Sequence, residues 1–288
     1  MAGQSRKVKT RITATKKTAQ ITKAMNMVST SKLRVAERAI KEYRPFIEKA
    51  KDIIAHLASA EDNLSHPLMK PRTIQKICYV VLSSDRGLAG VFNANVFKAL
   101  SHQIANNKES YCVYPLGLKA YMYCKKMQYL LVEDKLIYLR DDVDFNSVSE
   151  VIHAIVFQYL KQTFDKVILI YNHYVNTLIQ ETAIETILPV SDIHTKEQTS
   201  RLTYEFEGGV KEILDTALPI YIENTIYSYI LDSKASEHAA RMNSMKSATD
   251  NATEVIATLE LLYNRARQAA ITMELTDIVG GASVVNEN

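Results

Sequence analysis

The stretch most typical of a ligand-binding loop is "SSDRGLAG" at 83–90, which lies between a predicted buried strand and a predicted helix. In α/β proteins, a glycine-containing turn at this point can hold a phosphate group at the helix N-terminus. The stretch matches neither the GxGxxG pattern of dinucleotide sites nor the GxxxxGK[ST] pattern of P-loops. We therefore interpret it as a strand-to-helix turn in which Gly87 and Gly90 serve backbone geometry. In this interpretation Asp85 and Arg86 either pair with each other or contact a partner.

The other reactive side chains form no catalytic or metal-binding pattern. The three cysteines include no CxxC pair, and the seven histidines include no HxH or HxxxH pair. Neither a disulfide nor a zinc site is therefore expected. The carboxylates of "RDDVD" (140–144), which are Asp141, Asp142 and Asp144, lack the Gly and Glu of a calcium loop and are interpreted as a solvated turn. With no nucleophile–base set, the sequence predicts a chain that is not an enzyme and that uses no cofactor.

Positive charge is concentrated at the N-terminus. The net charge of the chain is only +3, yet residues 1–36 carry nine lysines and arginines, and the first acidic residue is Glu37. This asymmetry points to an acidic partner, which could be nucleic acid, an anionic membrane surface or an acidic protein loop. A basic helix without a partner is the alternative. The apolar patch within "ITKAMNMV" (21–28) argues against nucleic acid, because a helix lying on phosphates would expose it.

Residues 3–58 contain a single proline, Pro45, and no glycine after Gly3, which predicts one long helix. Pro45 is expected to bend this helix or to mark a weak point in it. A second apolar patch on the helix indicates more than one neighbour; it consists of Ile21, Ala24, Met25 and Val28. A 4-3 spacing typical of coiled coils runs through Val8, Ile12, Thr15, Ala19, Thr22, Asn26, Ser29, Leu33, Ala36, Ile40, Tyr43, Ile47, Ala50, Ile54 and Leu57.

Residues 210–279 predict a second long helix, with Pro219 breaking or kinking its start and Gly280 and Gly281 ending it. Its stripe runs through Met242, Met245, Thr249, Ala252, Ile256, Leu259, Tyr263, Ala266, Ala270 and Met273. Helices this long need a partner to bury such stripes. Because the middle of the chain lies between them, we expect the two helices to pair as an antiparallel coiled coil.

The middle of the chain alternates strands with helices, which predicts a Rossmann-like α/β domain with a partly parallel sheet. The predicted strands are 76–84, 111–117, 128–133, 166–175 and 180–190, and the predicted helices are 91–106, 118–127 and 148–162. The expected fold class is thus α/β with long helices, divided into residues 1–60, 73–208 and 209–288. No apolar run is long enough to cross a membrane, and "MAGQSRKVKT" lacks the apolar core of a secretory signal.

Three stretches together resemble the gamma subunit of F-type ATP synthases: "ITKAMNMVSTSKLR" (21–34), "SSDRGLAGVFNANVFK" (83–98) and the helix at 237–282. The resemblance covers residues 1–282. It implies a central-stalk rotor, one copy per hexamer of alpha and beta subunits, with the coiled coil inside the hexamer. The α/β domain would contact the epsilon subunit and the c-subunit ring, which proton flow turns. No nucleic acid and no catalytic chemistry of its own are implied. The alternative is a basic coiled-coil protein that binds nucleic acid or acts as a scaffold.

The resemblance also implies three sets of contact residues, and ordinary helix packing is the alternative for each of them. Contacts with the catalytic hexamer fall on Lys23, Met25, Arg267, Gln268, Thr272 and Glu274. An apolar bearing falls on Ile271, Leu275, Ile278 and Val279. Contacts with the ring and epsilon fall on Tyr204, Phe206 and Glu207, within "YEFEGG" (204–209). The start of the chain matches the family's mature start, which favours a bacterial protein, peripheral on the cytoplasmic face of the cell membrane.

Overall fold

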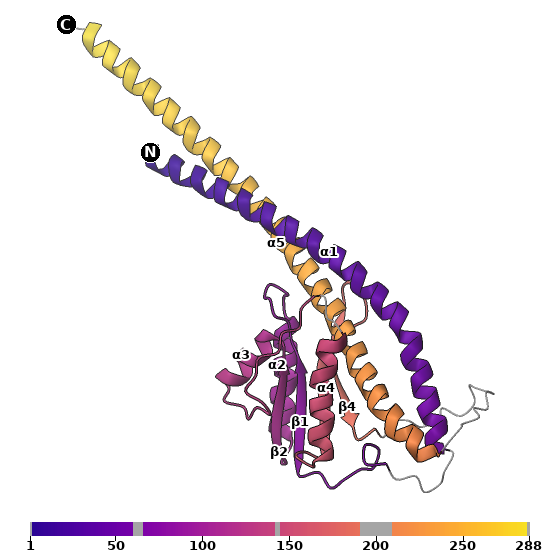
Figure 1. Cartoon of the computed structure of the whole chain (residues 1–288). Coiled ribbons are helices and arrows are strands. Elements are labelled where there is room, and N and C mark those ends of the chain that lie inside the picture. Colours follow the sequence, from indigo (N-terminus) through magenta and orange to yellow (C-terminus); the bar gives the residue numbers. More distant parts are fainter. Residues whose placement is uncertain (1, 60–65, 142–144, 191–208, 287–288) are drawn as a thin grey trace. The chain divides into compact units, whose positions relative to one another are not determined.

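The computed structural model of the chain describes residues 2–59, 66–141, 145–190 and 209–286. Its contacts divide the chain into two compact units. The larger unit is residues 29–241, and the smaller unit combines residues 1–28 with 242–288. The elements in chain order are α1 (Ala2–Ser59), β1 (Lys76–Leu82), α2 (Phe92–Asn106), β2 (Ser110–Leu116), α3 (Leu118–Lys126), α4 (Phe145–Leu160), β3 (Lys166–Tyr174), β4 (Gln180–Leu188) and α5 (Val210–Asn286), as labelled in Figure 1.

The larger unit is built on a four-stranded sheet with the order β2-β1-β3-β4. Strand β1 is parallel to both β2 and β3, whereas β4 is antiparallel to β3. Helix α2 connects β1 to β2, and α4 precedes β3, so each parallel pair is joined by a crossover that contains a helix. The predicted α/β domain with a partly parallel sheet is therefore confirmed.

One predicted strand is wrong. Residues 128–133 form no strand in the described structure and make only an isolated parallel bridge between Val113 and Leu131. Two backbone hydrogen bonds hold this segment to β2, from Val113 N to the Leu130 oxygen at 2.8 Å and from Val132 N to the Val113 oxygen at 3.0 Å. The apolar residues of this segment give it strand character, but the chain leaves the sheet edge after these bonds, so no ladder forms. Helix α4 also begins earlier than predicted, at Phe145.

The core lies on both faces of the sheet, because successive strand residues point to opposite sides. On one face, Cys78, Val80 and Leu82 of β1 pack with apolar residues of α1, α4 and α5. On the other face, Ile77 and Tyr79 pack with residues of α2 and α3. Figure 1 shows α4 and α5 on one side of the sheet and α2 and α3 on the other. The larger unit thus has three layers, and part of α5 is an integral layer.

Helix α1 confirms the predicted 4-3 stripe. All fifteen stripe positions are buried or half-buried, from Val8 to Leu57. Small and polar residues in the middle of the stripe do not interrupt it, because they bring the neighbouring helix close rather than fill a wide gap. Pro45 is exposed and lies inside the continuous helix.

Helix α5 is longer than predicted. It is continuous from Val210 through Pro219, and it continues past Gly280 and Gly281 to Asn286, so neither glycine ends it. The prediction was wrong because a glycine in a helix costs only about 1 kcal/mol relative to alanine, which does not by itself terminate a helix. The predicted stripe is buried or half-buried from Met242 to Ala270, and its last member, Met273, is exposed.

Candidate functional surfaces

The smaller unit is an antiparallel helix pair. Three polar contacts each join a residue of α1 to a residue of α5. As the residue numbers increase along α1, those of their partners decrease along α5. The contacts are Lys16 Nζ to Glu260 Oε1 at 2.6 Å, the Thr22 and Thr249 hydroxyls at 2.7 Å, and Asn26 Nδ2 to the Met242 carbonyl oxygen at 2.8 Å. This arrangement confirms the antiparallel pairing that the two stripes predicted.

Side chains of different sizes alternate along this pair. Ile12 of α1 and Met245, Ala252 and Leu259 of α5 are buried. Threonine and asparagine occupy the central stripe positions of α1 and use their hydrogen-bonding groups across the helix pair. A buried polar group that finds a partner in one register loses it in another, so these contacts specify the alignment of the two helices.

A basic face covers the N-terminal part of α1. Seven cationic side chains of residues 6–23 are exposed, and Lys16 is the one among them with an ion-pair partner in the described structure. They are Arg6, Lys7, Lys9, Arg11, Lys16, Lys17 and Lys23. Lys23 also lines a groove of about 380 Å³ together with Lys246 and Asp250. The predicted contact residue Lys23 is therefore accessible to a partner.

An exposed apolar patch lies in the same helix segment as these cations. Ile21 and Val28 of the predicted patch are 60% and 55% exposed, and Met27 is 59% exposed. Met25 is half-buried instead. The sequence analysis did not include Met27 in this patch, because a spacing of six residues places it about 120° around the helix from Ile21. Apolar residues left bare beside a cationic face indicate a surface that another molecule covers.

The last described turns of α5 carry the other predicted contacts, and all of them are exposed. Arg267, Gln268, Thr272 and Glu274 are exposed, and the Thr272 hydroxyl donates to the Gln268 carbonyl oxygen at 3.0 Å. The predicted bearing residues Ile271, Leu275, Ile278 and Val279 are 47%, 58%, 68% and 67% exposed. The structure thus collects eight of the predicted residues on one bare helix end. Tyr204, Phe206 and Glu207 lie outside the described residues.

The loop at 83–90 in the larger unit is held by its own hydrogen bonds. Asn93 Oδ1 accepts from Ser84 N at 3.0 Å, and Asn93 Nδ2 donates to Ser84 Oγ at 2.7 Å. Asp85 and Arg86 do not pair with each other: Asp85 Oδ1 accepts from Leu118 N at 2.9 Å, at the start of α3. The Arg86 carbonyl accepts from the Arg241 guanidinium at 3.3 Å. The interpretation as a strand-to-helix turn is supported.

The two glycines of this loop differ. Gly90 has a φ of 56°, a conformation that favours glycine, in agreement with the predicted geometric role. A side chain at Gly87 would meet nothing within 4 Å, and the neighbouring residue with positive φ is Leu88, at 64°. The geometric role predicted for Gly87 is therefore wrong. The strictest glycine nearby is Gly117, whose φ is 96° and where a Cβ would lie 2.3 Å from the Ser83 carbonyl oxygen.

A buried ionic network in α5 was not predicted. Glu237 is 3% exposed, and its two carboxylate oxygens accept from Lys234 Nζ at 3.0 Å and Arg241 Nη2 at 2.7 Å. Both cations are buried as well. The i, i+3 and i+4 spacing of these residues was a signal, but the same spacing is common on exposed helices. The network fastens α5 to the loop at 83–90, because Arg241 also donates to the carbonyls of Arg86 and Gly87.

The carboxylate cluster at 140–144 is only partly a solvated turn. Asp141 forms an ion pair with Lys32 of α1, and Asp141 Oδ1 lies 3.7 Å from Nε2 of the buried His238. Asp142 and Asp144 lie outside the described residues. Within the described ranges, no three His, Cys, Asp or Glu side chains gather in a way that could hold a metal ion. In the same ranges, no helix is long and apolar enough to span a bilayer.

Comparison with known proteins gives a family match along nearly the entire chain. The model of the ATP synthase family matches residues 4–285. Among solved structures, a central-stalk/c-ring chain of Tetrahymena thermophila mitochondrial ATP synthase is 22% identical, with a TM-score of 0.60 over 79% of this chain and 99% of that chain. A rotor chain of the Euglena gracilis enzyme is 18% identical, with a TM-score of 0.66 over 94% and 100%.

A third structure matches almost all of both chains. This chain of the Euglena gracilis mitochondrial OSCP/F1/c-ring assembly is 20% identical, with a TM-score of 0.70 over 99% of this chain and 95% of that chain. The shared fold places two long helices around an α/β unit, as the three sequence stretches predicted. The protein therefore belongs to the gamma family of F-type ATP synthases, the family of the central-stalk rotor subunit.

Proposed function

We propose that this subunit transmits torque to the catalytic hexamer through the bare end of α5 and the basic face of α1. The observation that carries the proposal is the exposure of every described side chain of residues 271–279, four of which are the predicted bearing residues. A helix end that is half apolar and wholly uncovered is stable in an assembly that surrounds it. Weak apolar contacts also suit a surface that must slide, since they are not directional.

The basic face of α1 fits an acidic loop of the catalytic subunits. Its exposed lysines and arginines supply long-range attraction, whereas the exposed apolar side chains of Ile21, Met27 and Val28 supply contact area. On the opposite helix, Arg267, Gln268, Thr272 and Glu274 provide scattered hydrogen-bonding groups. We propose that Lys23 and Met25 contact the same hexamer from α1, and that one copy of the chain serves each hexamer.

We also propose that the subunit is not catalytic. The loop at 83–90, which was the strongest candidate for a ligand loop, uses its polar side chains to tie strands to helices. Ser83 Oγ, for example, donates to the Leu116 carbonyl oxygen and accepts from Ala120 N at 2.7 Å. These groups support the sheet edge and α3, which is a structural role. The catalytic groups of the complex would then lie in its other subunits.

The remaining assignments follow from membership of the family. We propose that Tyr204, Phe206 and Glu207 contact the c-subunit ring and the epsilon subunit. The complex would place this chain as a peripheral component on the cytoplasmic face of a bacterial membrane. The functional division would be residues 1–60 and 209–288 as the shaft, and residues 73–208 as the α/β domain.

Co-expression with the alpha and beta subunits of the same organism tests the proposal. We expect one peak in size exclusion, one copy of this chain per hexamer, and ATPase activity that depends on it. Lys23→Glu should weaken this dependence, whereas Lys98→Glu on the exposed face of α2 is a matched charge reversal outside the proposed surface. If the chain does not co-elute but binds DNA in a salt-dependent way, the basic coiled-coil alternative replaces the proposal.

A further inference from the structure

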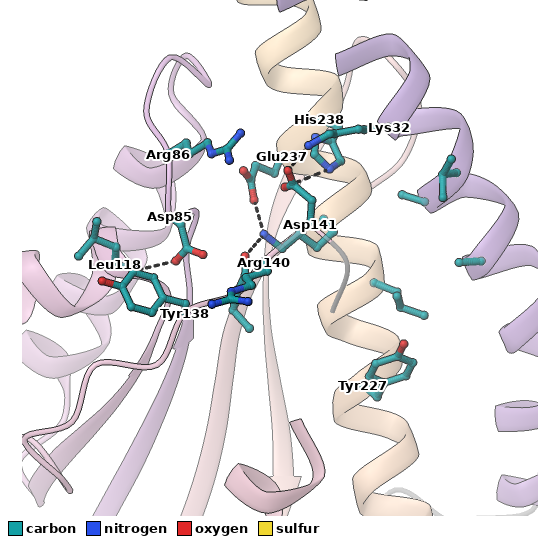
Figure 2. Close-up of a pocket in the computed structure, with 16 residues that line it drawn as sticks. Lys32, Asp85, Arg86, Leu118, Tyr138, Arg140, Asp141, Tyr227, Glu237 and His238 are labelled. Carbon is teal, nitrogen blue, oxygen red and sulfur yellow. Dashed lines mark hydrogen bonds and ion pairs between the residues drawn. The ribbon is translucent and has the colours of Figure 1, made fainter. Parts of the chain in front are cut away.

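A cavity of about 810 Å³ lies within the larger unit, between α1, α5 and the loops that follow β1 and precede α4. Its volume is in the range of small-molecule sites, which is about 300–1,000 Å³. Figure 2 shows charged side chains on one side of it, including Asp85, Arg86, Arg140 and Glu237. None of these groups belongs to the surfaces proposed above for the rotor function, so the cavity calls for a separate explanation.

Two of the cationic side chains that line the cavity have no ion-pair partner among the described residues. Four cationic side chains line it, and two of them are paired, Lys234 with Glu237 and Lys32 with Asp141. The third carboxylate, Asp85, accepts the backbone N–H of Leu118. Arg86 and Arg140 make no side-chain hydrogen bond or ion pair with any described residue, and both are exposed. The rim of the cavity thus presents two guanidinium groups that have no side-chain partner among the described residues.

Two hydrogen bonds to its carbonyl oxygen hold the backbone of Arg86 in place. Its carbonyl accepts from the buried Arg241 at 3.3 Å and from Ser84 Oγ at 2.6 Å, so the backbone at this rim is held in place. Arg140 follows Leu139, which is 5% exposed and whose carbonyl accepts from Lys234. Hydrogen bonds therefore hold the backbone at or next to both arginines. Guanidinium groups bind phosphate and carboxylate through paired hydrogen bonds, which ammonium groups do not match.

A second observation points to a bound molecule. His238 lines the cavity and is 3% exposed, yet its Nδ1 has no hydrogen-bond partner in the described structure. Its other ring nitrogen is 3.7 Å from Asp141. A buried nitrogen without a partner costs free energy, and a ligand or an ordered water in the cavity would relieve this cost.

Exposed apolar side chains also line the cavity, and Figure 2 shows Tyr138 beside Asp85 and Arg140. Val35 of α1 is 66% exposed and Tyr138 is 55% exposed, and both line the cavity with Leu231 of α5. Tyr138 makes no ring contact within the described residues, whereas the Tyr227 ring already packs against Tyr43 and Phe145. An open aromatic ring suits a flat or aliphatic group.

We propose that this cavity binds a small organic anion. Its phosphate or carboxylate would lie between Arg86 and Arg140, and its apolar body would lie against the Tyr138 ring. The combination of a cationic rim with exposed apolar side chains excludes two simpler occupants. A bare inorganic anion would leave the apolar side chains uncovered, and a neutral apolar molecule would leave the guanidinium groups unpaired.

Photolabelling of the assembled complex tests this site with 4-azidophenyl phosphate, which carries both an aryl body and a phosphate. Mass spectrometry of this chain then separates label in the cavity from label at nucleotide sites of other subunits. We expect label on peptides that contain Val35 or Tyr138, and competition by phenyl phosphate and phenylacetate. Phenol and inorganic phosphate should compete at least roughly tenfold more weakly, because each supplies only half of the interaction.

Variants make the test specific. Arg86→Gln with Arg140→Gln should reduce cavity labelling at least roughly tenfold, since two charge-assisted hydrogen-bonding groups are removed. Lys98→Gln with Lys126→Gln removes the same charge from the exposed surfaces of α2 and α3 and should leave labelling unchanged. Asp85→Asn should strengthen labelling, because it removes a carboxylate from the site of an anion but keeps the oxygen that caps Leu118.

Four results would overturn the proposal. The first three are the absence of label from the cavity peptides, equal loss of label in the two double variants, and weaker labelling in Asp85→Asn, which would indicate a cationic ligand. The fourth is competition by phenol that is as strong as competition by phenyl phosphate, because the apolar side chains alone would then explain binding. The outcome is independent of the proposed hexamer contacts on α1 and α5, which belong to the smaller unit.

Discussion

Two nine-residue segments of the same helix reverse the usual relation between polarity and burial. Residues 233–241 of α5, "SKASEHAAR", are polar or small, and all nine are buried within the larger unit. Residues 271–279, "ITMELTDIV", are mostly apolar, and every described side chain among them is exposed. The first segment is buried because the chain itself covers it and pairs its charges. The second is exposed because no described part of the chain covers it, which is expected when the covering surface belongs to other subunits.

Substitutions in the two segments should have different effects on the free energy of unfolding. In the buried segment, a lost partner leaves a charge without water and without a counter-ion. In the exposed segment, a lost side chain changes little in the isolated chain, because water already surrounds it. Stability measurements on the chain should therefore respond to one segment, and measurements on the complex should respond to the other.

The largest effect on stability is expected for Glu237→Gln. The substitution leaves Lys234 and Arg241 buried without their shared carboxylate, which costs about 3–5 kcal/mol in the free energy of unfolding. Denaturant unfolding of the full chain measures this. Glu260→Gln at an exposed ion pair in the same helix is the matched control and should cost less than about 1 kcal/mol. Equal costs in the two variants would mean that the buried network is not a stabilising feature.

His238 adds a dependence on pH to the buried segment. Burial, together with the nearby cations Arg241 and Lys234, lowers the pKa of His238 to about 4 against the opposing charges of Glu237 and Asp141. The folded chain therefore takes up this proton at lower pH than the unfolded chain, whose histidine has an ordinary pKa of 6.5. Stability from this group is present above about pH 6.5 and is lost as pH falls toward about 4.

The full change across that interval is roughly 3 kcal/mol, since each pKa unit corresponds to about 1.4 kcal/mol. Unfolding of wild-type chain and His238→Gln at several pH values measures it, and the variant should lose less stability between pH 7 and 4. His102→Gln on the exposed surface of α2 should follow the wild-type profile. Parallel profiles for wild type and His238→Gln would show that this histidine titrates normally.

The sequence predicted the stripes better than it predicted the buried charges. A stripe is a repeating signal, so errors at single residues, such as the polar Asn26, do not obscure it. Lys234 and Glu237 carry no comparable signal, because their burial depends on a loop about 150 residues earlier in the chain that accepts from Arg241. Likewise, the spacing of glycines did not reveal that Gly117, rather than Gly87, is the residue without room for a side chain.

The candidate contact surface was predictable for a different reason. Exposure of Ile271 and Ile278 cannot be inferred from hydrophobicity, which favours burial. Resemblance to the gamma family supplied that expectation, because a family's motif records contacts with molecules that the single chain lacks. Neither signal revealed the cavity beside Arg86 and Arg140, since its lining residues come from five separated parts of the sequence.

The ion pair between Lys16 and Glu260 should contribute little. Both side chains are about half exposed, so the attraction is screened and ordering the two side chains costs entropy. A double-mutant cycle with Lys16→Gln and Glu260→Gln should give a coupling of about 0.2–1 kcal/mol that decreases in 0.5 M salt. A larger coupling that salt does not weaken would indicate that the helix pair excludes water at this point.

The smallest effect on the isolated chain, and the most informative one, is expected at the end of α5. Replacing Ile271, Leu275 and Ile278 by serine should change the free energy of unfolding by less than about 1 kcal/mol, because surface substitutions away from packed features have little effect. In the co-expressed complex, the same triple variant should reduce retention of the chain in size exclusion or the ATPase activity that depends on it. Thr253→Ser, at another exposed position of α5, is the control. If the triple variant assembles and supports ATPase activity as well as wild type, these exposed apolar side chains are not needed for function. The proposed bearing would then be wrong.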